Sequence, residues 1–327
     1  MSSFLAGRAA PEIDAALESG VVEVAPASPP VKPTIRPKAR QRLEPFTAVS
    51  YVVVGIFTLF CLVPFWMILA GSFTDESKLA LSGYSMWPHP FSVAAYVDLF
   101  TGQSLLAGYF ASLFITIVGT ALSLTTTAAL AWVIARRLPG ISRPLTIFAY
   151  LPLLFTGGLV PLYLLVTQYL HLQNSWFSVI LPAMMSPFLV FVAVSFFRQL
   201  PEEILDSARI DGAGELRIFF QIVVPLSKPI LAVLGLFYAV TYWNEWFTAL
   251  LFISDPNKFP LQLILQNLIA NVTNAAQLPG TSAAQSAAPV YQLRLAMTVL
   301  TVAPILLAYP FAQRFFVKGL TLGATKG

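Results

Sequence analysis

Between two long apolar runs lies the charged segment Pro201-Glu-Glu-Ile-Leu-Asp-Ser-Ala-Arg-Ile-Asp-Gly-Ala213. The runs on either side carry few charges, whereas the loop over residues 198–228 collects charges of both signs. A membrane protein with such a loop between two spans presents a docking surface to a soluble partner. The alternative is an ordinary solvated loop whose charges keep it out of lipid.

The composition supports lipid as the solvent of this protein. The 327-residue chain is 57% hydrophobic and only 10% charged, whereas soluble domains carry about 25% charged residues. The single cysteine, Cys61, lies within an apolar run, so no disulfide forms within the chain. We therefore predict an all-α, polytopic membrane protein.

Uncharged runs of about 20 residues, the length that crosses a bilayer core, predict six membrane-spanning helices. The predicted spans cover residues 48–71, 105–135, 145–167, 176–197, 229–253 and 295–313. The polar stretch Gln168–Ser175 separates the third span from the fourth. Residues 1–45, rich in proline and poor in large apolar residues, are expected to form a disordered cytoplasmic extension before the permease domain of residues 46–327.

The distribution of positive charge predicts the orientation in the membrane. All of the 19 Lys and Arg except Lys78, Lys258 and Arg294 fall in segments on the same side as the N-terminus. Because positive residues favour the cytoplasm, both termini and the loop over residues 198–228 are predicted to be cytoplasmic. Long outer loops then cover residues 72–104 and 254–294, and the second, rich in Ala, Ser, Gln, Asn and Thr, is predicted to be flexible.

The charged segment carries the signals of a short helix and a turn. Pro201 and the acidic residues after it, including Glu203, favour a helix start. Gly212 is suited to end the helix or turn the chain. Ser207 and Ala208 are small, which permits close approach of another surface.

A second helical piece is predicted beyond the turn. Apolar residues recur there at helical spacing, which predicts one apolar face, and Pro225 and Pro229 break the backbone before the fifth span. The residues of the predicted face are Leu216, Phe219, Phe220 and Val223.

The spacing of this loop resembles the EAA loop of ABC-importer permeases of the carbohydrate (maltose-type) class. In that pattern an acidic-small-Ala triplet is followed after three residues by Gly and after nine more by Ile-x-aliphatic-Pro. Here Asp206 replaces the usual Glu, Ser207 the usual Ala, and Val224 the usual Leu before Pro225. The resemblance covers about residues 46–327. It is most similar to permeases for polysaccharide-derived oligosaccharides, including alginate-type transporters, and the further segments that carry it are 83–88, 155–161, 242–246 and 315–324.

The resemblance implies a type I ABC-importer permease fold with a cytoplasmic coupling helix, in a bacterial plasma (inner) membrane. It implies a second, homologous permease chain, two copies of a cytosolic ATPase that bind ATP and Mg, and an extracytoplasmic solute-binding protein that delivers the sugar. It assigns coupling to the ATPase to Glu203, Asp206, Ser207, Ala208, Asp211, Gly212, Ala213 and Pro225.

Candidate residues for the translocation path lie in the third and fifth spans. Glu245 is an ionisable group in an apolar run, and such groups are functional candidates. It either faces the sugar path or pairs with a neighbouring helix, and a structural or gating role is favoured. A glycine pair weakens the third span, which indicates either a path-lining break or a packing kink. The full set is Gly157, Gly158, Tyr242, Trp243, Asn244 and Glu245.

Several chemistries have no support in the sequence. There is no G-x-x-x-x-G-K-[ST] phosphate loop, so ATP is expected to bind the partner ATPase and no cofactor is expected in this chain. Metal-ligand spacing and catalytic sets in the spans are also missing. The predicted function is import of an oligosaccharide or polysaccharide fragment by a subunit without its own ATPase site. The rivals are an ion- or proton-coupled secondary transporter acting without an ATPase, which Glu245 alone supports weakly, and an intramembrane enzyme.

Overall fold

The computed structural model describes residues 45–277 and 290–324, which are mostly helical; within these ranges the only β pairing is a bridge between Thr74 and Phe91. The chain divides into two compact units, Met1–Phe57 and Thr58–Gly327. Helix α2 (Pro45–Ser72) crosses this boundary. The extension predicted over residues 1–45 lies outside the described residues, except for Pro45.

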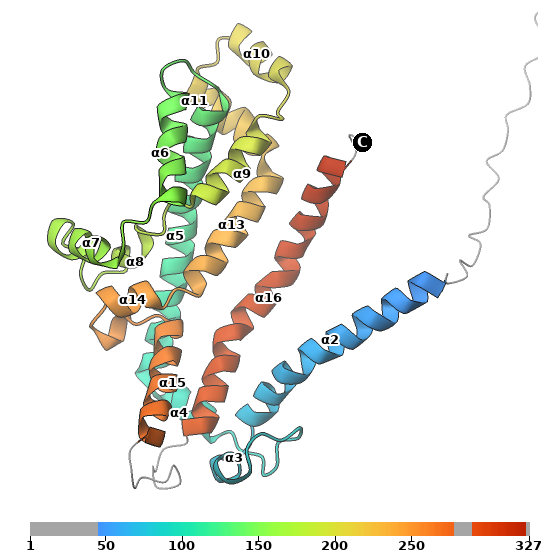
Figure 1. Ribbon diagram of the computed structural model, residues 1–327, viewed down its shortest axis with the longest axis vertical. Helices are drawn as coiled ribbons and strands as arrows, with labels where there is room; N and C mark the ends of the chain where they lie inside the picture. Colours follow the sequence, from blue (N-terminus) through green and yellow to red (C-terminus); the bar gives the residue numbers. More distant parts are fainter. Residues whose placement is uncertain (1–44, 278–289, 325–327) are drawn as a thin grey trace, which may run out of the picture. The chain divides into compact units, whose positions relative to one another are not determined.

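Helix α5 (Gln103–Ala135) is the centre of the second unit. It packs along α13 (Lys228–Trp243) and α9 (Pro187–Phe197), as Figure 1 shows. Gly119 allows the close approach, because a Cβ at this position would lie 2.8 Å from the ring of Tyr242. Small residues bring helices together in lipid in the same way, since van der Waals contact is a main attractive force there.

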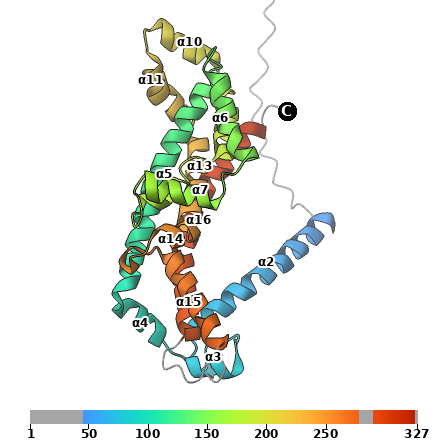
Figure 2. The same cartoon turned by 60° about the vertical axis from the view of Figure 1, so that its left-hand side comes forward.

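Helix α16 (Val290–Ala324) packs against α13 and against α15 (Leu261–Gln277), seen in Figure 2. Helix α15 occupies part of the outer segment that was predicted to be flexible, so this prediction was wrong over residues 261–277. The reason is burial: Leu261 and Leu265 pack in a cluster with Leu105, Trp243 and Met297. Residues 278–289 of the same segment lie outside the described ranges.

The long helices only partly match the predicted spans. Three helices, Val49–Ser72, Ser104–Ala135 and Val290–Leu307, are long and apolar enough to cross a membrane, and there are up to five candidates if each of two bent pairs is one span. These counts refer to the described residues. The number of six membrane-spanning helices stays a prediction. The fourth predicted span consists of α8 (Phe177–Ile180) and α9.

The third and fifth predicted spans are not single helices. Helix α6 (Ser142–Leu154) meets the pair α7 (Leu159–Leu164) and η1 (Leu165–Tyr169) at 118°. The break contains Gly158 at φ +81°, a left-handed conformation that favours glycine. The fifth predicted span is also divided into two helices. Helix α13 ends at Trp243, and α14 (Phe247–Phe252) begins after a short break.

The segment predicted as the first outer loop is folded and tied to α16. It contains α3 (Glu76–Ser82) and α4 (Ala94–Thr101). The Glu76 carboxylate accepts the backbone N–H groups of Tyr291 and Gln292 at 2.9 and 2.7 Å, which caps the first turn of α16. Burial raises the pKa of Tyr96, whose hydroxyl donates to Ser72 Oγ. Helices α3 and α4 lie at the end of α5 opposite to the charged loop (Figure 1; Figure 2).

Candidate functional site

The charged segment folds as the short helix α10 (Glu202–Ile210), which confirms the predicted helix and turn. Pro201 precedes the helix as its N-cap, and Leu205, 5% exposed, anchors it to the core. Gly212 has φ +78°, and the next residue, Ala213, donates its N–H to Ala208 O at 2.9 Å. Only glycine adopts this left-handed turn without strain, which explains Gly212 at the end of the helix.

The exposed face of α10 consists of Glu203, Ser207 and Ile210. At about 100° per residue these positions lie opposite Leu205. Ser207 Oγ donates to Glu203 O at 2.7 Å, and the Ile210 side chain is 87% exposed. An apolar side chain at such exposure suits burial against a partner. Sequence reasoning missed Ile210, although an isoleucine inside a charged segment was a usable signal.

Two of the small residues predicted for the docking surface face inward. Ala208 and Ala213 are partly buried and pack against the core, whereas Ser207 stays exposed. The small residues at 208 and 213 therefore let α10 lie close to its own chain. Asp211 is exposed at the end of the helix.

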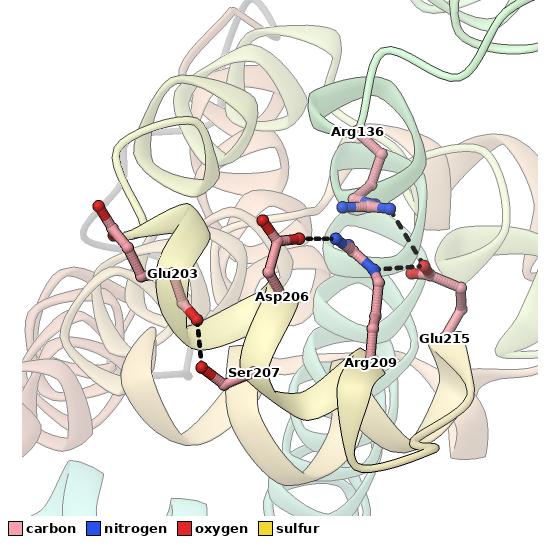
Figure 3. Close-up of polar contacts among 6 residues, drawn as sticks. All are labelled: Arg136, Glu203, Asp206, Ser207, Arg209 and Glu215. Carbon is pink, nitrogen blue, oxygen red and sulfur yellow. Dashed lines mark hydrogen bonds and ion pairs between the residues drawn. The ribbon is translucent and has the colours of Figure 1, made fainter.

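A network of ion pairs joins the loop to α5, drawn in Figure 3. Arg209 pairs with Asp206 in the same helix, and its Nε lies 3.4 Å from Glu215 Oε1. The same Glu215 oxygen accepts from Arg136 Nη2 at 3.0 Å, directly beyond the last residue of α5. The Arg136 side chain is only 20% exposed, and its guanidinium stacks on Trp132, 5.4 Å from the ring centroid. Glu215 thus connects α10 to the end of α5.

The segment after the turn departs from the predicted single helix. It consists of α11 (Glu215–Ile218), the π-helical turn η2 (Phe219–Val223) and α12 (Val224–Leu226). A π turn has a wider spacing than an α turn, so the predicted apolar face is split. Phe219 and Val223 are buried, whereas Leu216 and Phe220 are exposed. Pro225 lacks an N–H for the helix ladder, and the chain bends by 82° between α12 and α13.

The residues predicted for the translocation path lie in two helix breaks and in the packed interior. Gly157 and Gly158 are exposed in the break between α6 and α7. Asn244 and Glu245 lie in the break between α13 and α14, where Asn244 Oδ1 accepts from Gln262 Nε2 at 3.1 Å. The Glu245 carboxylate accepts the Thr248 N–H at 2.8 Å and so caps α14.

Tyr242 and Trp243 face the packed interior in this conformation. They are 2% and 6% exposed. The Tyr242 hydroxyl hydrogen-bonds Ser123 Oγ at 2.8 Å and donates to Ile180 O at 3.0 Å, and Trp243 Nε1 donates to Thr301 O at 3.1 Å. These contacts hold helices together, and a path-lining role for either residue stays a prediction. Over residues 45–277 and 290–324, no group of three His, Cys, Asp or Glu is placed to hold a metal.

Curated relatives cover nearly the whole chain. It is 40% identical over 277 residues to protein LplC of Bacillus subtilis strain 168, a match that spans 84% of this chain and 91% of LplC. It is 34% identical over 282 residues to the polygalacturonan/rhamnogalacturonan transport system permease YtcP of the same organism, covering 86% and 98%. The arabinooligosaccharides transport system permease AraQ, also of Bacillus subtilis, is 30% identical over 301 residues, covering 88% and 99%. No family model matches.

Solved structures share the fold. A bacterial ABC transporter involved in the import of the acidic polysaccharide alginate has a chain that matches with a TM-score of 0.73 at 24% identity, covering 86% of this chain and 100% of that one. A bacterial alginate ABC transporter in complex with an alginate-pentasaccharide-bound periplasmic protein matches with a TM-score of 0.58 at 15% identity, covering 82% and 92%. The predicted importer-permease fold is thereby confirmed.

Proposed function

Because the chain belongs to the permease subunits of ABC transport systems for sugars, we propose that it passes an oligosaccharide or polysaccharide fragment into the cytoplasm, driven by ATP hydrolysis in a partner. The relatives YtcP and AraQ are named for polygalacturonan/rhamnogalacturonan and for arabinooligosaccharides, which supports a cargo of polysaccharide fragments or oligosaccharides. In this proposal ATP and Mg bind only to the partner ATPase, and the chain itself carries no cofactor.

The exposed face of α10 is the observation that carries the proposal. It presents Glu203, Ser207 and the 87% exposed Ile210 on a helix whose opposite side is anchored by Leu205. This face is the docking surface for one copy of the ATPase, with Ile210 as its apolar anchor. A few residues near the centre of an interface that become fully buried contribute most of the binding energy.

The ion-pair network transmits the movement. When ATP closes the ATPase dimer, α10 is displaced, and Glu215 carries the displacement to Arg136 at the end of α5. The turn at Gly212 and the 82° bend before α13 carry it along the backbone. Through the ion pairs and the backbone, α5 and α13 rotate together. This rotation opens the sugar site first to one side of the membrane and then to the other.

A second permease chain completes the path, with contacts on α2 and α16. Leu59, Phe60 and Leu62 of α2 are 65%, 77% and 55% exposed. An apolar groove of about 460 Å³ lies between residues 59–69 of α2 and residues 298–306 of α16. A helix of the second permease fits this groove, because helices in lipid associate through close packing.

The break between α6 and α7 and the break between α13 and α14 line the path that the sugar takes. Irregular backbone within a membrane is tolerated where it is buried in protein or lines a water-filled cavity. The break at Gly157 and Gly158 and the amide pair of Asn244 with Gln262 expose polar groups suited to sugar hydroxyls. A solute-binding protein on the outer side delivers the cargo, and both termini of the chain lie in the cytoplasm.

The test compares two matched substitutions. Ile210→Asp places a charge on the docking face, and Leu81→Asp places the same charge on α3 at the opposite end, where the side chain is 81% exposed. Tagged variants are purified from the native membrane in mild detergent, and accompanying proteins are identified by mass spectrometry. We expect an ATPase and a second permease with the wild type and with Leu81→Asp, and loss of the ATPase with Ile210→Asp.

A chain that never recovers an ATPase contradicts the proposal. In that case the ion-coupled transporter is the better account, and Glu245 becomes the residue to test. Equal ATPase recovery with both variants contradicts the assignment of the docking face.

A further inference from the structure

Beneath α10 lies a polar hollow of about 290 Å³ to which the proposed function assigns no ligand. It is bounded by the end of α5, the end of α9 and the inner side of α10. Four guanidinium groups and two carboxylates line it, which leaves an excess of positive charge. These residues are Arg136, Arg137, Arg198, Arg209, Glu202 and Asp206.

The positive charge of this hollow is only partly compensated. Arg136 and Arg209 share Glu215, and Arg209 also pairs with Asp206. Arg137 and Arg198 form no ion pair with the part of the chain that the structure describes. Arg136 Nε and Arg209 Nη2 are buried without an acceptor among the same residues. A buried donor without a partner is unfavourable, so the arrangement favours an anionic acceptor.

A second hollow, apolar and of about 230 Å³, adjoins the first. Both hollows are lined by Trp132 and Arg136, so these two side chains form the wall between them. The apolar hollow lies between α5 and the α11–η2 segment, with Ala129, Val133 and Phe220 in its lining. Its charged lining groups are Arg136 and Glu215, which are paired to each other.

We propose that the paired hollows bind one anionic phospholipid, with its phosphate among the arginines and the start of an acyl chain in the apolar hollow. The inference rests on the proposed function for one point, the cytoplasmic placement of the loop. The ligand chemistry follows from charge complementarity, because guanidinium groups bind phosphate oxygens in bidentate geometry. Basic pockets at the cytoplasmic ends of membrane helices recognise anionic headgroups in this manner.

The apolar hollow distinguishes a lipid from a free anion. Inorganic phosphate would satisfy the arginines but would leave the neighbouring apolar surface unfilled. Trp132, at the wall between the hollows, is of the residue type that gathers where a bilayer meets water. A lipid held there contacts α5, α9 and α10 together and therefore stiffens the joint through which the coupling helix moves.

The experiment measures lipid binding directly. The full-length chain, with whatever subunits accompany it, is purified in mild detergent, stripped of lipid, and titrated with phosphatidylglycerol, phosphatidylcholine or inorganic phosphate. Bound lipid is counted by native mass spectrometry. The test variant is R137Q/R198Q, which leaves every ion pair of Figure 3 in place. The control is R143Q, which removes a positive charge from an exposed position outside both hollows.

We expect the wild type and R143Q to retain phosphatidylglycerol and R137Q/R198Q to bind it roughly 30-fold more weakly, since each arginine contributes about fivefold near a membrane surface. If the double variant does not fold, the single variants R137Q and R198Q serve instead, and each is expected to bind phosphatidylglycerol about fivefold more weakly than the wild type. Ala129→Phe fills the apolar hollow, leaves all four arginines in the chain, and is expected to weaken lipid binding as well.

Three results would overturn the inference. These are equal binding by R137Q/R198Q and R143Q, equal retention of phosphatidylcholine, and stabilisation by inorganic phosphate that matches the lipid, which would identify a free-anion site. The readout needs neither uptake nor an ATPase. Failure to recover any ATPase would therefore remove the proposed function without touching the lipid result. Arginine-independent lipid binding would remove this inference alone.

Discussion

Helix α5 is held at two places by different chemistry. Along its middle, α13 contributes buried neutral hydrogen bonds, one between Tyr242 and Ser123 at 2.8 Å and one between Tyr238 and Thr127 at 2.6 Å. At its end, the loop contributes an ion pair between Arg136 and Glu215, whose side chain is 54% exposed.

The contact between α5 and α13 is therefore rigid, whereas the contact between α5 and the charged loop is movable. Buried neutral hydrogen bonds between closely packed helices are costly to break, because a separated polar group has no water to bond. Exposed ion pairs contribute little and reform easily, with typical values of about 0–1 kcal/mol. Helices α5 and α13 are therefore expected to move as one body, while α10 pivots on its ion pairs.

The largest expected effect is on the rigid contact, at Gly119. Alanine there would place a Cβ 2.8 Å from the Tyr242 ring. Overpacking of this kind costs about 1–3 kcal/mol, which should lower the thermal midpoint of the purified protein. Gly235→Ala is the matched control in α13, because its Cβ would meet Leu124 at an ordinary 3.8 Å. Equal midpoints for the two variants would show that the interface is loose.

The next effect is on the movable joint, at Gly212. Valine there must adopt φ +78°, at a cost of about 1–2 kcal/mol, whereas Gly214 has φ −70° and open space around it. Gly212→Val should weaken ATPase binding about tenfold, because the strained turn changes how α10 is presented. Gly214→Val should leave binding near the wild-type level. Binding titrations with the purified ATPase compare the two, and indistinguishable affinities would mean that the turn does not set the docking face.

Removal of the Tyr242 hydroxyl tests the rigid contact again with a smaller change. Tyr242→Phe leaves Ser123 Oγ and Ile180 O without this partner, at an expected cost of about 1 kcal/mol. Adding Ser123→Ala should recover part of the loss, since an unpaired hydroxyl is then removed. The thermal midpoints of Tyr242→Phe, Ser123→Ala and the double variant measure this recovery. If the losses of the two single variants simply add in the double variant, the hydrogen bond does not contribute.

The smallest effect is expected at the ion pair. A double-mutant cycle with Arg136→Gln and Glu215→Gln should give a coupling energy of at most about 1 kcal/mol. It should shrink as salt is raised from 0.05 to about 0.5 M, because salt screens partly exposed charges. The informative readout is sugar transported per ATP hydrolysed, which should fall in Glu215→Gln while the thermal midpoint stays constant. A fall in the midpoint without a change in this ratio would make Glu215 merely structural.

Local signals explain what the sequence predicted well. Pro201 and Gly212 mark α10 because a cap and a left-handed turn depend on the residues themselves. The pair Gly157 and Gly158 marked the break between α6 and α7 for the same reason. The assignment to sugar permeases came from the spacing of Asp206, Gly212 and Pro225.

Distant contacts explain what the sequence did not predict. Arg136 and Glu215 are 79 residues apart, so their ion pair depends on how α5 and the loop are placed. The register change at η2 split the expected apolar face of Phe219 and Phe220. Helix α15 was taken for a flexible loop because the polar residues that follow outweighed the leucines at its start, which are buried by Leu105 and Met297.

The most direct test of the account is cross-linking from position 207. Ser207→Cys in a Cys61→Ser background places the only cysteine of the chain on the docking face of α10. We predict that a short bifunctional maleimide–amine reagent joins this residue to the ATPase in inside-out membrane vesicles, and that Ser85→Cys, in the segment predicted to lie outside, gives no such product. Absence of an ATPase adduct at position 207, or labelling of that cysteine from outside intact cells, would contradict the account.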